Sequence, residues 1–357
     1  MSRPQFTSIT KQVAEHLRGE LRQGRWKDAM PGRTVLCREL GVSPKIVRLA
    51  LDQLADEGLL LPSGKGSKRG IVPGENNGTR KLRISILHYE DADHRASYML
   101  DLMHRLMAAG YDTALAERSL CDFKMNLGRI AAYVSKSEAD AWIVVSAPHE
   151  ILQWFSDQPI PVFALWGAMR RLPIAGAKPD KIPAQRQAVR RLYDLGHRRI
   201  VQFVRHERIN SGIGLNEQAF INDLKALGIS TGPYNLASWD GTKAGFHERM
   251  RSLFMHTPPT ALFISEENMF MAAQLHLARI GFSVPEKISI ISYDPDPGFF
   301  LCEPTIAHIS WSYEPILRRI LRWVENVSHG REDRRQSLTK ASFVEGGSIG
   351  PAPSASR

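Results

Sequence analysis

Basic side chains recur near the start of the chain, on what should be one short helix. Between Ser43 and Gly58, apolar residues at three- and four-residue spacing place Lys45 and Arg48 on the opposite face. On a solvent-facing helix, arginine and lysine are the side chains that read base edges and neutralise phosphates. This stretch is therefore suited to binding a polyanion, and an ordinary solvated helix is the alternative.

A second basic group lies in the turn-rich segment PSGKGSKRG, between the short apolar runs 59–61 and 71–72. Two such runs around a Gly-rich tip predict a β-hairpin, or wing. At that tip Lys65, Lys68 and Arg69 would face phosphates or the minor groove. Two independent basic elements in one small fold favour duplex DNA binding over a solvated surface.

Carboxylates and aromatic rings follow several apolar runs later in the chain. Asp294 ends ISIISYD, where it would either orient a ligand hydroxyl or cap a turn. Glu267 follows TALFIS and precedes a helix, so it would either contact a ligand or favour the helix N-terminus. Trp166, Trp239 and Tyr89 lie at or just after strand-like runs, where a ring would stack on a sugar or pack in the core.

Catalytic and cofactor motifs are weak or missing. Gly212-Ile213-Gly214 lacks the third glycine of a dinucleotide fingerprint, and GKGSKRG lacks the ending of a phosphate-binding loop. The chain contains no HExxH or GxSxG, and its 12 histidines show no clear metal spacing. We therefore expect no catalytic residue, no metal ligand and no cofactor. An enzyme remains the alternative only through unmarked residues of a cleft.

Three helices must position the basic residues. The apolar stripe of residues 8–23 predicts an amphipathic helix that supplies a core, and a short helix is expected over Thr34 to Leu40. The third helix begins with a hydroxyl cap at Ser43 and with Pro44 at the first helical position, and it ends at Gly58. The order is that of a helix-turn-helix whose second helix enters the major groove.

The rest of the chain alternates short apolar runs with helix-length segments. Residues 73–80 contain breakers and no apolar residue, which predicts a linker. After it two successive series of strands and helices indicate an α/β fold with parallel sheets in two lobes, and a cleft between the lobes is the expected ligand site. The expected domains are a winged helix-turn-helix (1–72), a linker (73–80), a two-lobed effector domain (81–351) and a tail (352–357).

Composition agrees with this division. Of the net charge of +10, residues 1–80 carry 14 Lys and Arg against 8 Asp and Glu, and the remainder carries 33 against 29. A small basic head on a nearly balanced body suits polyanion binding by the head.

The three distant cysteines predict no disulfide framework. No signal peptide or long apolar run is present, which predicts a cytoplasmic protein without a membrane span.

Residues 9–72 resemble the winged-helix head of GntR-type bacterial regulators. The likeness is carried by the first helix, Pro31, the run ELGVS, Val47-Arg48, Ala50-Leu51 and the ending EGLL. Arg48 matches a basic residue of the family's recognition helix, and Gly64 and Gly66 match its wing. The chain departs from the pattern at two family arginine positions, which are Thr34, with Arg33 one place earlier, and Pro44.

Residues 82–351 resemble the sugar-binding-protein-like effector domain of LacI-type regulators. The likeness is carried by LGHRRI (195–200), PTALF (259–263), Gly281, Val284-Pro285, the run from Ser289 to Asp294, and Phe343-Val344-Glu345. The resemblance implies ligand contacts at Asp294 and at Glu267, where the family has Asp. The arginine of the family's RxxGF pattern, which often meets the effector, corresponds to Asn216. A sugar is the ligand that the family leads us to expect.

The expected function is that of a DNA-binding transcriptional regulator, most simply a repressor released by its ligand. A homodimer on a near-palindromic operator is expected, and closure of the lobes on a carbohydrate would change the separation of the two heads. The alternative is an α/β enzyme that acts on a small polar metabolite in the cleft.

Overall fold

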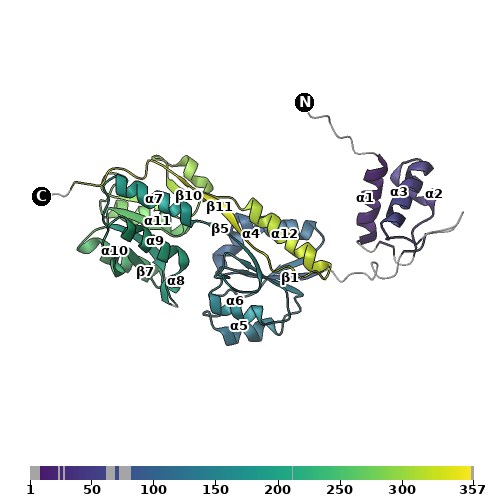
Figure 1. The fold of residues 1–357 in the computed structure, drawn as a ribbon, viewed down its shortest axis with the longest axis horizontal. Helices are drawn as coiled ribbons and strands as arrows, with labels where there is room; N and C mark the ends of the chain where they lie inside the picture. Colours follow the sequence, from purple (N-terminus) through teal and green to yellow (C-terminus); the bar gives the residue numbers. More distant parts are fainter. Residues whose placement is uncertain are drawn as a thin grey trace, which may run out of the picture. The chain divides into compact units, whose positions relative to one another are not determined.

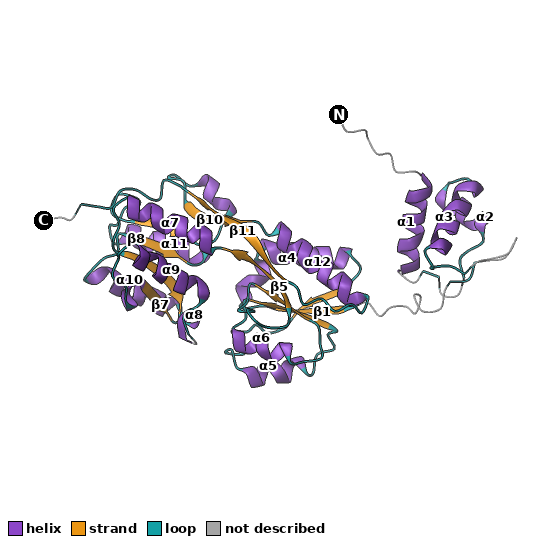
Figure 2. Ribbon diagram, viewed as in Figure 1, coloured by secondary structure: helices purple, strands orange, loops and turns teal. Residues whose placement is uncertain are grey.

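The computed structural model describes residues 9–22, 25–26, 29–61, 69–71, 82–210 and 212–354. These residues belong to two compact units. One unit comprises residues 1–143 and 159–161, and the other comprises residues 144–158 and 162–357. Figures 1 and 2 show the helices and strands of both units.

Three helices form the head of the first unit: α1 (Ile9–Arg22), α2 (Arg33–Leu40) and α3 (Pro44–Asp56) (Figure 1). The predicted stripe on α1 is buried against α3, because Leu17 and Leu21 pack with Val47 and Leu54 in one core cluster. Gly41, with a φ of 64°, makes the left-handed turn between α2 and α3. The helix-turn-helix that the sequence predicts is therefore present.

The base of a small antiparallel sheet closes this head. Isolated bridges pair Ala29 with Gly70 and Leu60 with Ile71. The amide of Met30 donates to the carbonyl of Arg69 at 2.9 Å, and the amide of Leu61 donates to the carbonyl of Gly70 at 2.8 Å. The chain after α3 thus returns on itself as the wing prediction requires, while Lys65 and Lys68, two of the predicted tip residues, lie outside the described ranges.

The first unit continues into an α/β segment. Its elements are β1 (Arg83–Leu87), the 3-10 helix η1 (Asp91–Arg95), α4 (Ser97–Ala108), β2 (Asp112–Leu115), α5 (Leu127–Val134) and the start of β3 (Ala141–Val145). Strands β1 and β2 are parallel, with Ile84 opposite Thr113. A helix between two parallel strands is the unit that the apolar runs predict.

The second unit is built on parallel strands covered by helices (Figure 2). Its strand order is β4-β5-β11-β10-β9-β8-β6-β7. The strands are β4 (Val162–Leu165), β5 (Ala175–Asp180), β6 (Ile200–Arg205), β7 (Leu236–Trp239), β8 (Ala261–Ile264), β9 (Ser289–Ser292), β10 (Ala307–Trp311) and β11 (Gln336–Val344). The helices are α6 (His149–Ser156), α7 (Ile182–Asp194), α8 (Glu207–Asn210), α9 (Leu215–Ala226), η2 (Pro233–Asn235), α10 (Lys243–Met255), α11 (Glu267–Arg279), η3 (Pro297–Leu301) and α12 (Glu314–Ser328).

Alternation along the central strands divides the interior into two cores. On β8, Leu262 and Ile264 face a cluster with α10 and α11, whereas Ala261 and Phe263 face a cluster with α7 and α9. Successive side chains of a strand point to opposite faces, so a strand buried on both faces is apolar throughout. This is why the run TALFIS has no polar alternation.

Strand β11 belongs to both halves of the strand order. Its residues 336–340 pair in parallel with β5, and residues 341–344 pair antiparallel with β10. In Figure 1 it runs as one continuous strand past β10 and β5. A single segment therefore joins the sheet that contains β4 and β5 to the sheet that contains β6 to β10.

The α/β fold class predicted from the sequence is confirmed. Among the described residues, none of the helices combines the length and the apolar composition that crossing a bilayer requires.

Candidate functional site

The outer face of α3 presents two cations, Lys45 and Arg48. The Ser43 hydroxyl accepts from the amide of Ile46 at 3.5 Å, and Pro44 occupies the first turn, so the helix begins where the sequence predicts. Lys45 and Arg48, one turn apart, are exposed and make no ion pair with any described residue. Their charge is available to an external anion.

Two further arginines of the head, Arg18 and Arg25, are held by carboxylates. Arg18 donates to Glu57 at 2.7 Å, and Arg25 pairs with Glu20 and Glu39. Arg33 and Thr34, at the start of α2, are exposed like Lys45 and Arg48, and the described residues offer Arg33 no carboxylate partner. The available positive charge thus gathers on α2 and α3, the two helices of the helix-turn-helix.

Arg69 occupies a different position from the one expected at the tip of the wing. Its guanidinium donates to the backbone carbonyl of Leu51 at 2.7 Å and to the carboxylate of Asp52, and its side chain is 17% exposed. Arg69 therefore ties the base of the wing to α3. The predicted contacts of Lys65 and Lys68 lie outside the described residues.

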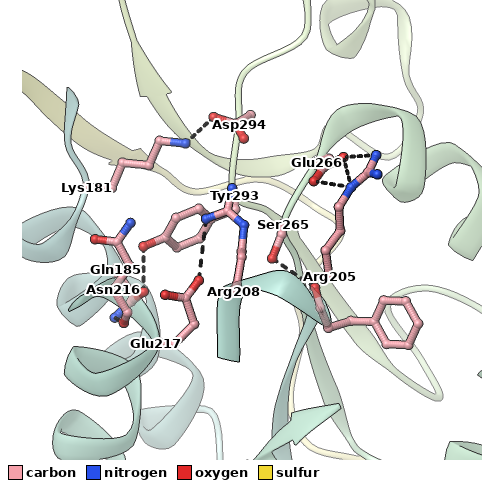
Figure 3. Close-up of polar contacts among 11 residues, drawn as sticks. Lys181, Gln185, Arg205, Arg208, Asn216, Glu217, Ser265, Glu266, Tyr293 and Asp294 are labelled. Atoms are coloured by element: carbon pink, nitrogen blue, oxygen red, sulfur yellow. Dashed lines mark hydrogen bonds and ion pairs between the residues drawn. The ribbon is translucent and has the colours of Figure 1, made fainter. Parts of the chain in front are cut away.

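A polar cluster lies in the second unit, at the carboxyl ends of its strands (Figure 3). Asp294 follows β9, and its Oδ1 accepts hydrogen bonds from Lys181 Nζ and, at 3.0 Å, from Trp311 Nε1. Lys181 stands between β5 and α7. Burial lowers the pKa of its ammonium, and the Asp294 carboxylate opposes that shift. Asp294 is thus placed by three elements that are far apart in sequence.

Aromatic rings border this pair. Trp166 lies directly after β4 with a φ of 61°, a left-handed conformation that is uncommon for a side chain of its size. Its ring centroid is 5.8 Å from that of Trp311 and 6.0 Å from that of Tyr313. Lys181 Nζ lies 5.4 Å from the Trp311 ring centroid. Such a group of rings can stack on a flat ligand face.

A buried chain of hydrogen bonds continues from Asp294 towards α9. The Tyr293 hydroxyl donates to Gln185 Oε1 at 2.7 Å, and Gln185 Nε2 donates to the backbone carbonyl of Asn216 at 3.2 Å. Burial raises the pKa of Tyr293, so its hydroxyl remains a donor at neutral pH. Gln185 thus connects Tyr293, the neighbour of Asp294, to the backbone of Asn216 at the start of α9.

Two arginines flank the cluster (Figure 3). Arg208, on α8, reaches the buried carboxylate of Glu217 at 3.4 Å. Arg205, at the end of β6, makes a two-point contact with Glu266 at 2.8 and 2.9 Å. The site thus contains lysine, arginine, carboxylate, amide and indole groups, a set that can hydrogen-bond the hydroxyls or charged groups of a small polar molecule.

The remaining expected ligand residues are Trp239, which borders the cluster through Arg205 at 5.3 Å from its ring centroid, Tyr89 and Glu267. Trp239 is 9% exposed and packs at 5.4 Å against the ring of Phe246 in a core cluster, which is the packing alternative. Tyr89 follows β1 in the first unit and is half-buried. Glu267 begins α11, and its side chain lies outside the described part of the chain.

Lys181, Arg208 and Trp311 were not predicted. Lys181 follows a strand with the sequence AGAKPD, which lacks an apolar run, and Arg208 lies on α8, a helix of four residues that is too short to show a periodic pattern. Trp311 does end an alternating run, AHISW, and this signal could have located it.

Two family models match the chain. Residues 9–67 match the bacterial regulatory proteins of the gntR family, and residues 189–349 match the periplasmic binding protein-like domain. The chain therefore joins a helix-turn-helix domain that matches the gntR family to a domain that matches the periplasmic binding protein-like family.

Among curated relatives, the chain is similar to the HTH-type transcriptional repressor CytR of Escherichia coli, with 31% identity over 37% of this chain and 38% of the relative. The match thus spans well under half the length of that protein. It is also similar to the repressor PurR of Pectobacterium carotovorum, with 24% identity over 66% of this chain and 71% of the relative.

Solved structures share the fold. A complex of the transcriptional regulator CelR with cellobiose has a TM-score of 0.62 at 19% identity, and covers 96% of this chain and 100% of that one. The lac repressor dimer bound to operator and an anti-inducer has a TM-score of 0.62 at 16% identity, over 76% of this chain and 96% of that one. A LacI family regulator of Enterococcus faecium with bound ribose has a TM-score of 0.61 at 18% identity, over 75% of this chain and 99% of that one.

Proposed function

We propose that the protein is a transcriptional repressor whose hold on an operator is controlled by a small carbohydrate bound at the Asp294 cluster. The observation that carries the DNA-binding half is the exposure of Arg33, Lys45 and Arg48 on α2 and α3 without partners among the described residues. Arg18, Arg25 and Arg69 are paired with carboxylates, whereas these three cations lie on the two helices that contact DNA in helix-turn-helix proteins.

The Asp294 cluster supports a polar, ring-shaped effector. Asp294, Lys181 and Asn216 provide acceptors and donors for hydroxyls, and Trp166 and Trp311 provide ring faces. The solved relatives that hold cellobiose and ribose favour a carbohydrate. Arg208 supplies a guanidinium that reaches Glu217, the residue after Asn216, and Asn216 is the position at which LacI-type regulators carry an arginine.

A homodimer would place two heads on a two-fold symmetric operator. Four large apolar side chains are exposed on α11 and η3, which touch through Phe270 and Phe299 at 5.3 Å between ring centroids. The four are Met271 (65% exposed), Leu275 (72%), Phe300 (80%) and Leu301 (75%). Exposed apolar side chains on two elements that touch are suited to an association surface, and we call these four residues the α11–η3 patch. The matched lac repressor structure is a dimer.

This function places the protein in the cytoplasm with DNA and metabolites as partners. The curated relatives are transcriptional regulators, which favours regulation over the enzyme alternative. The ligand favours the conformation that cannot bind the operator. A preference of about 3 kcal/mol for that conformation lowers occupancy of the operator by roughly a hundredfold.

Gel-shift titration on the DNA upstream of its own gene, with and without a panel of mono- and disaccharides, tests the proposal. We expect a specific complex that weakens with added salt and is released by one class of sugar. Turnover of a sugar together with equal affinity for all duplexes would instead establish the enzyme. If a specific complex forms but no carbohydrate, sugar acid or nucleoside alters it, the proposal of operator binding stands and the proposal of control by a carbohydrate is refuted.

A further inference from the structure

Two histidines meet at the carboxyl end of β1. His88 directly follows the strand and is completely buried, and His94 is exposed on η1. Their Nε2 atoms are 2.9 Å apart, and their ring centroids are 4.2 Å apart. The Nδ1 atom of His88 is also buried and makes no hydrogen bond to a described residue. The two atoms that face each other are both ring nitrogens, and a neutral imidazole binds a metal ion through either of its nitrogens.

A carboxylate completes the group. Asp91 and His94 are three residues apart on the 3-10 helix η1, and side chains at that spacing lie one above the other in such a helix. The ligand atoms that His88, Asp91 and His94 offer all lie within 4.8 Å of one another. The short helix thus presents two potential ligands on one side, next to a third that is fixed at the end of a strand.

The neighbouring carboxylates are already committed to the protein. Asp93 accepts hydrogen bonds from the amide of Tyr89 at 2.9 Å and from the Tyr98 hydroxyl at 3.1 Å, and Asp122 accepts from the amide and hydroxyl of Ser119. Asp91 is exposed and accepts no hydrogen bond from the described residues. It is therefore the carboxylate that is available to an ion.

The backbone around His88 is rigidly held. Its carbonyl accepts from the amide of Leu120 at 2.9 Å, and the next carbonyl, that of Tyr89, accepts from the amide of Cys121 at 2.9 Å. A ligand on a fixed strand end costs little ordering when it binds. Only the side chains of η1 need to adjust.

We propose that His88, Asp91 and His94 bind one divalent transition-metal ion of the zinc type. Two nitrogens at about 2.0–2.1 Å from a common ion are about 2.9–3.4 Å apart at bond angles near 90–109°, which matches the separation of the two Nε2 atoms. Imidazole and carboxylate together select zinc, nickel, copper or iron, whereas calcium and magnesium prefer oxygen alone. Three protein ligands leave a fourth position for water or a small ligand.

The metal would link η1 to the end of β1 beside Tyr89. The simpler alternative is a hydrogen bond between the two imidazoles, which needs no ion. The inference does not depend on DNA or sugar binding, because it rests on residues outside both of those sites.

Metal titration of untagged full-length protein, freed of metal with a chelator that is then removed, tests the site. Zn²⁺ is titrated by calorimetry, and Co²⁺ is followed by its visible absorption bands. We expect one equivalent per chain with both ions. His94→Ala should weaken binding by more than about 100-fold, since even the loss of outer partners of metal ligands costs about 10–100-fold. Asp91→Asn should weaken it less.

The matched control is His104→Ala, which removes an exposed histidine from α4 and should bind Zn²⁺ as the unaltered chain does. Circular dichroism of each variant separates loss of the site from loss of the fold. Absence of a one-equivalent step, equal binding by the His94→Ala variant, or a preference for Ca²⁺ would each overturn the proposal, and the first two would leave the histidines as a hydrogen-bonded pair.

Discussion

Lys181 and Asp294, which are 113 residues apart in sequence, form an ion pair that joins the start of α7 to the segment after β9. The carboxylate is therefore not free, because Lys181 and Trp311 already donate to one of its oxygens. An effector hydroxyl at Asp294 must use the remaining oxygen or displace the ammonium. The pair thus connects ligand binding to the position of α7.

Asp294→Asn should abolish the effector response and leave operator affinity within about threefold, because the head does not contain this residue. The amide keeps the shape of the carboxylate but removes the charge opposite Lys181, so stability should fall by about 1–3 kcal/mol. Effector response is measured by gel shift and stability by urea unfolding. Asp296→Asn, whose side chain caps η3, is the matched control. A normal response in the Asp294→Asn variant would place the effector elsewhere.

Arg48→Ala should weaken specific binding more than non-specific binding, by about 1–3 kcal/mol, or roughly 5- to 150-fold, because an arginine in the major groove can contact guanine at two points. The measurement is the ratio of affinities for operator and random duplex at one salt concentration. Arg129→Ala, which removes an exposed arginine from α5, should leave the ratio unchanged. Equal losses on both duplexes would assign Arg48 to the phosphates.

Wing residues should divide into two roles. Replacing Lys65 and Lys68 by Ala should reduce the slope of log affinity against log salt by about 2, since each phosphate contact contributes about 0.9. Asp52→Asn should reproduce the effect of Arg69→Ala on affinity, because Arg69 holds the wing base to α3 through Asp52 and Leu51. If Arg69→Ala flattens the salt slope and Asp52→Asn does not, Arg69 contacts phosphate directly.

Leu275→Glu should convert the proposed dimer to a monomer at micromolar concentration. A charge placed in the centre of an apolar interface is desolvated without a partner, which costs several kcal/mol. Analytical ultracentrifugation measures the change, and operator affinity should fall with it. Leu338→Glu alters another exposed leucine, on β11, and should remain dimeric. A dimer that survives Leu275→Glu would exclude the α11–η3 patch as the interface.

Stability should decrease as the pH falls below about 6.5, partly because of His197. Burial lowers the pKa of this imidazole, whose Nε2 contacts the carbonyl of Gly350 at 3.0 Å and whose Nδ1 is buried without a described partner. The unfolded chain then binds a proton more readily than the folded chain. The loss begins near the ordinary pKa of 6.5, continues down to the lower folded value, and is absent above 6.5.

Urea unfolding at several pH values checks this prediction. His197→Gln should lower stability at neutral pH but remove up to about 1.4 kcal/mol per pH unit of the slope below pH 6.5. Equal slopes for the two chains would show that His197 does not titrate on unfolding.

Periodicity was sufficient for most elements. Helices α1 and α3 lie within a residue or two of the predicted ranges, because their stripes and caps are local signals. Strand β5 could not be predicted: AGAKPD has no apolar run, and its residues are buried because β4 and β11 pair on its two sides. Because β5 could not be predicted, the position of Lys181 at its carboxyl end could not be predicted either.

In the candidate sites, too, the sequence locates individual residues but does not predict their partners. The sequence indicates that Asp294 ends a strand, but its partners Lys181 and Trp311 come from elements that only the sheet order brings together. Arg69 looked like an exposed basic residue of the wing, and its pairing with Asp52 depends on how the chain returns to α3. Charge patterns locate such residues, whereas their partners depend on tertiary structure.

The position of β11 near the end of the chain has a genetic consequence. Its residues 336–344 complete both sheets of the second unit, so a premature stop after Arg335 would expose edges on β5 and β10. Such an allele would retain the whole head and nearly all of the Asp294 cluster. We expect it nevertheless to yield an aggregation-prone product, so that late nonsense alleles would behave like complete deletions of the gene.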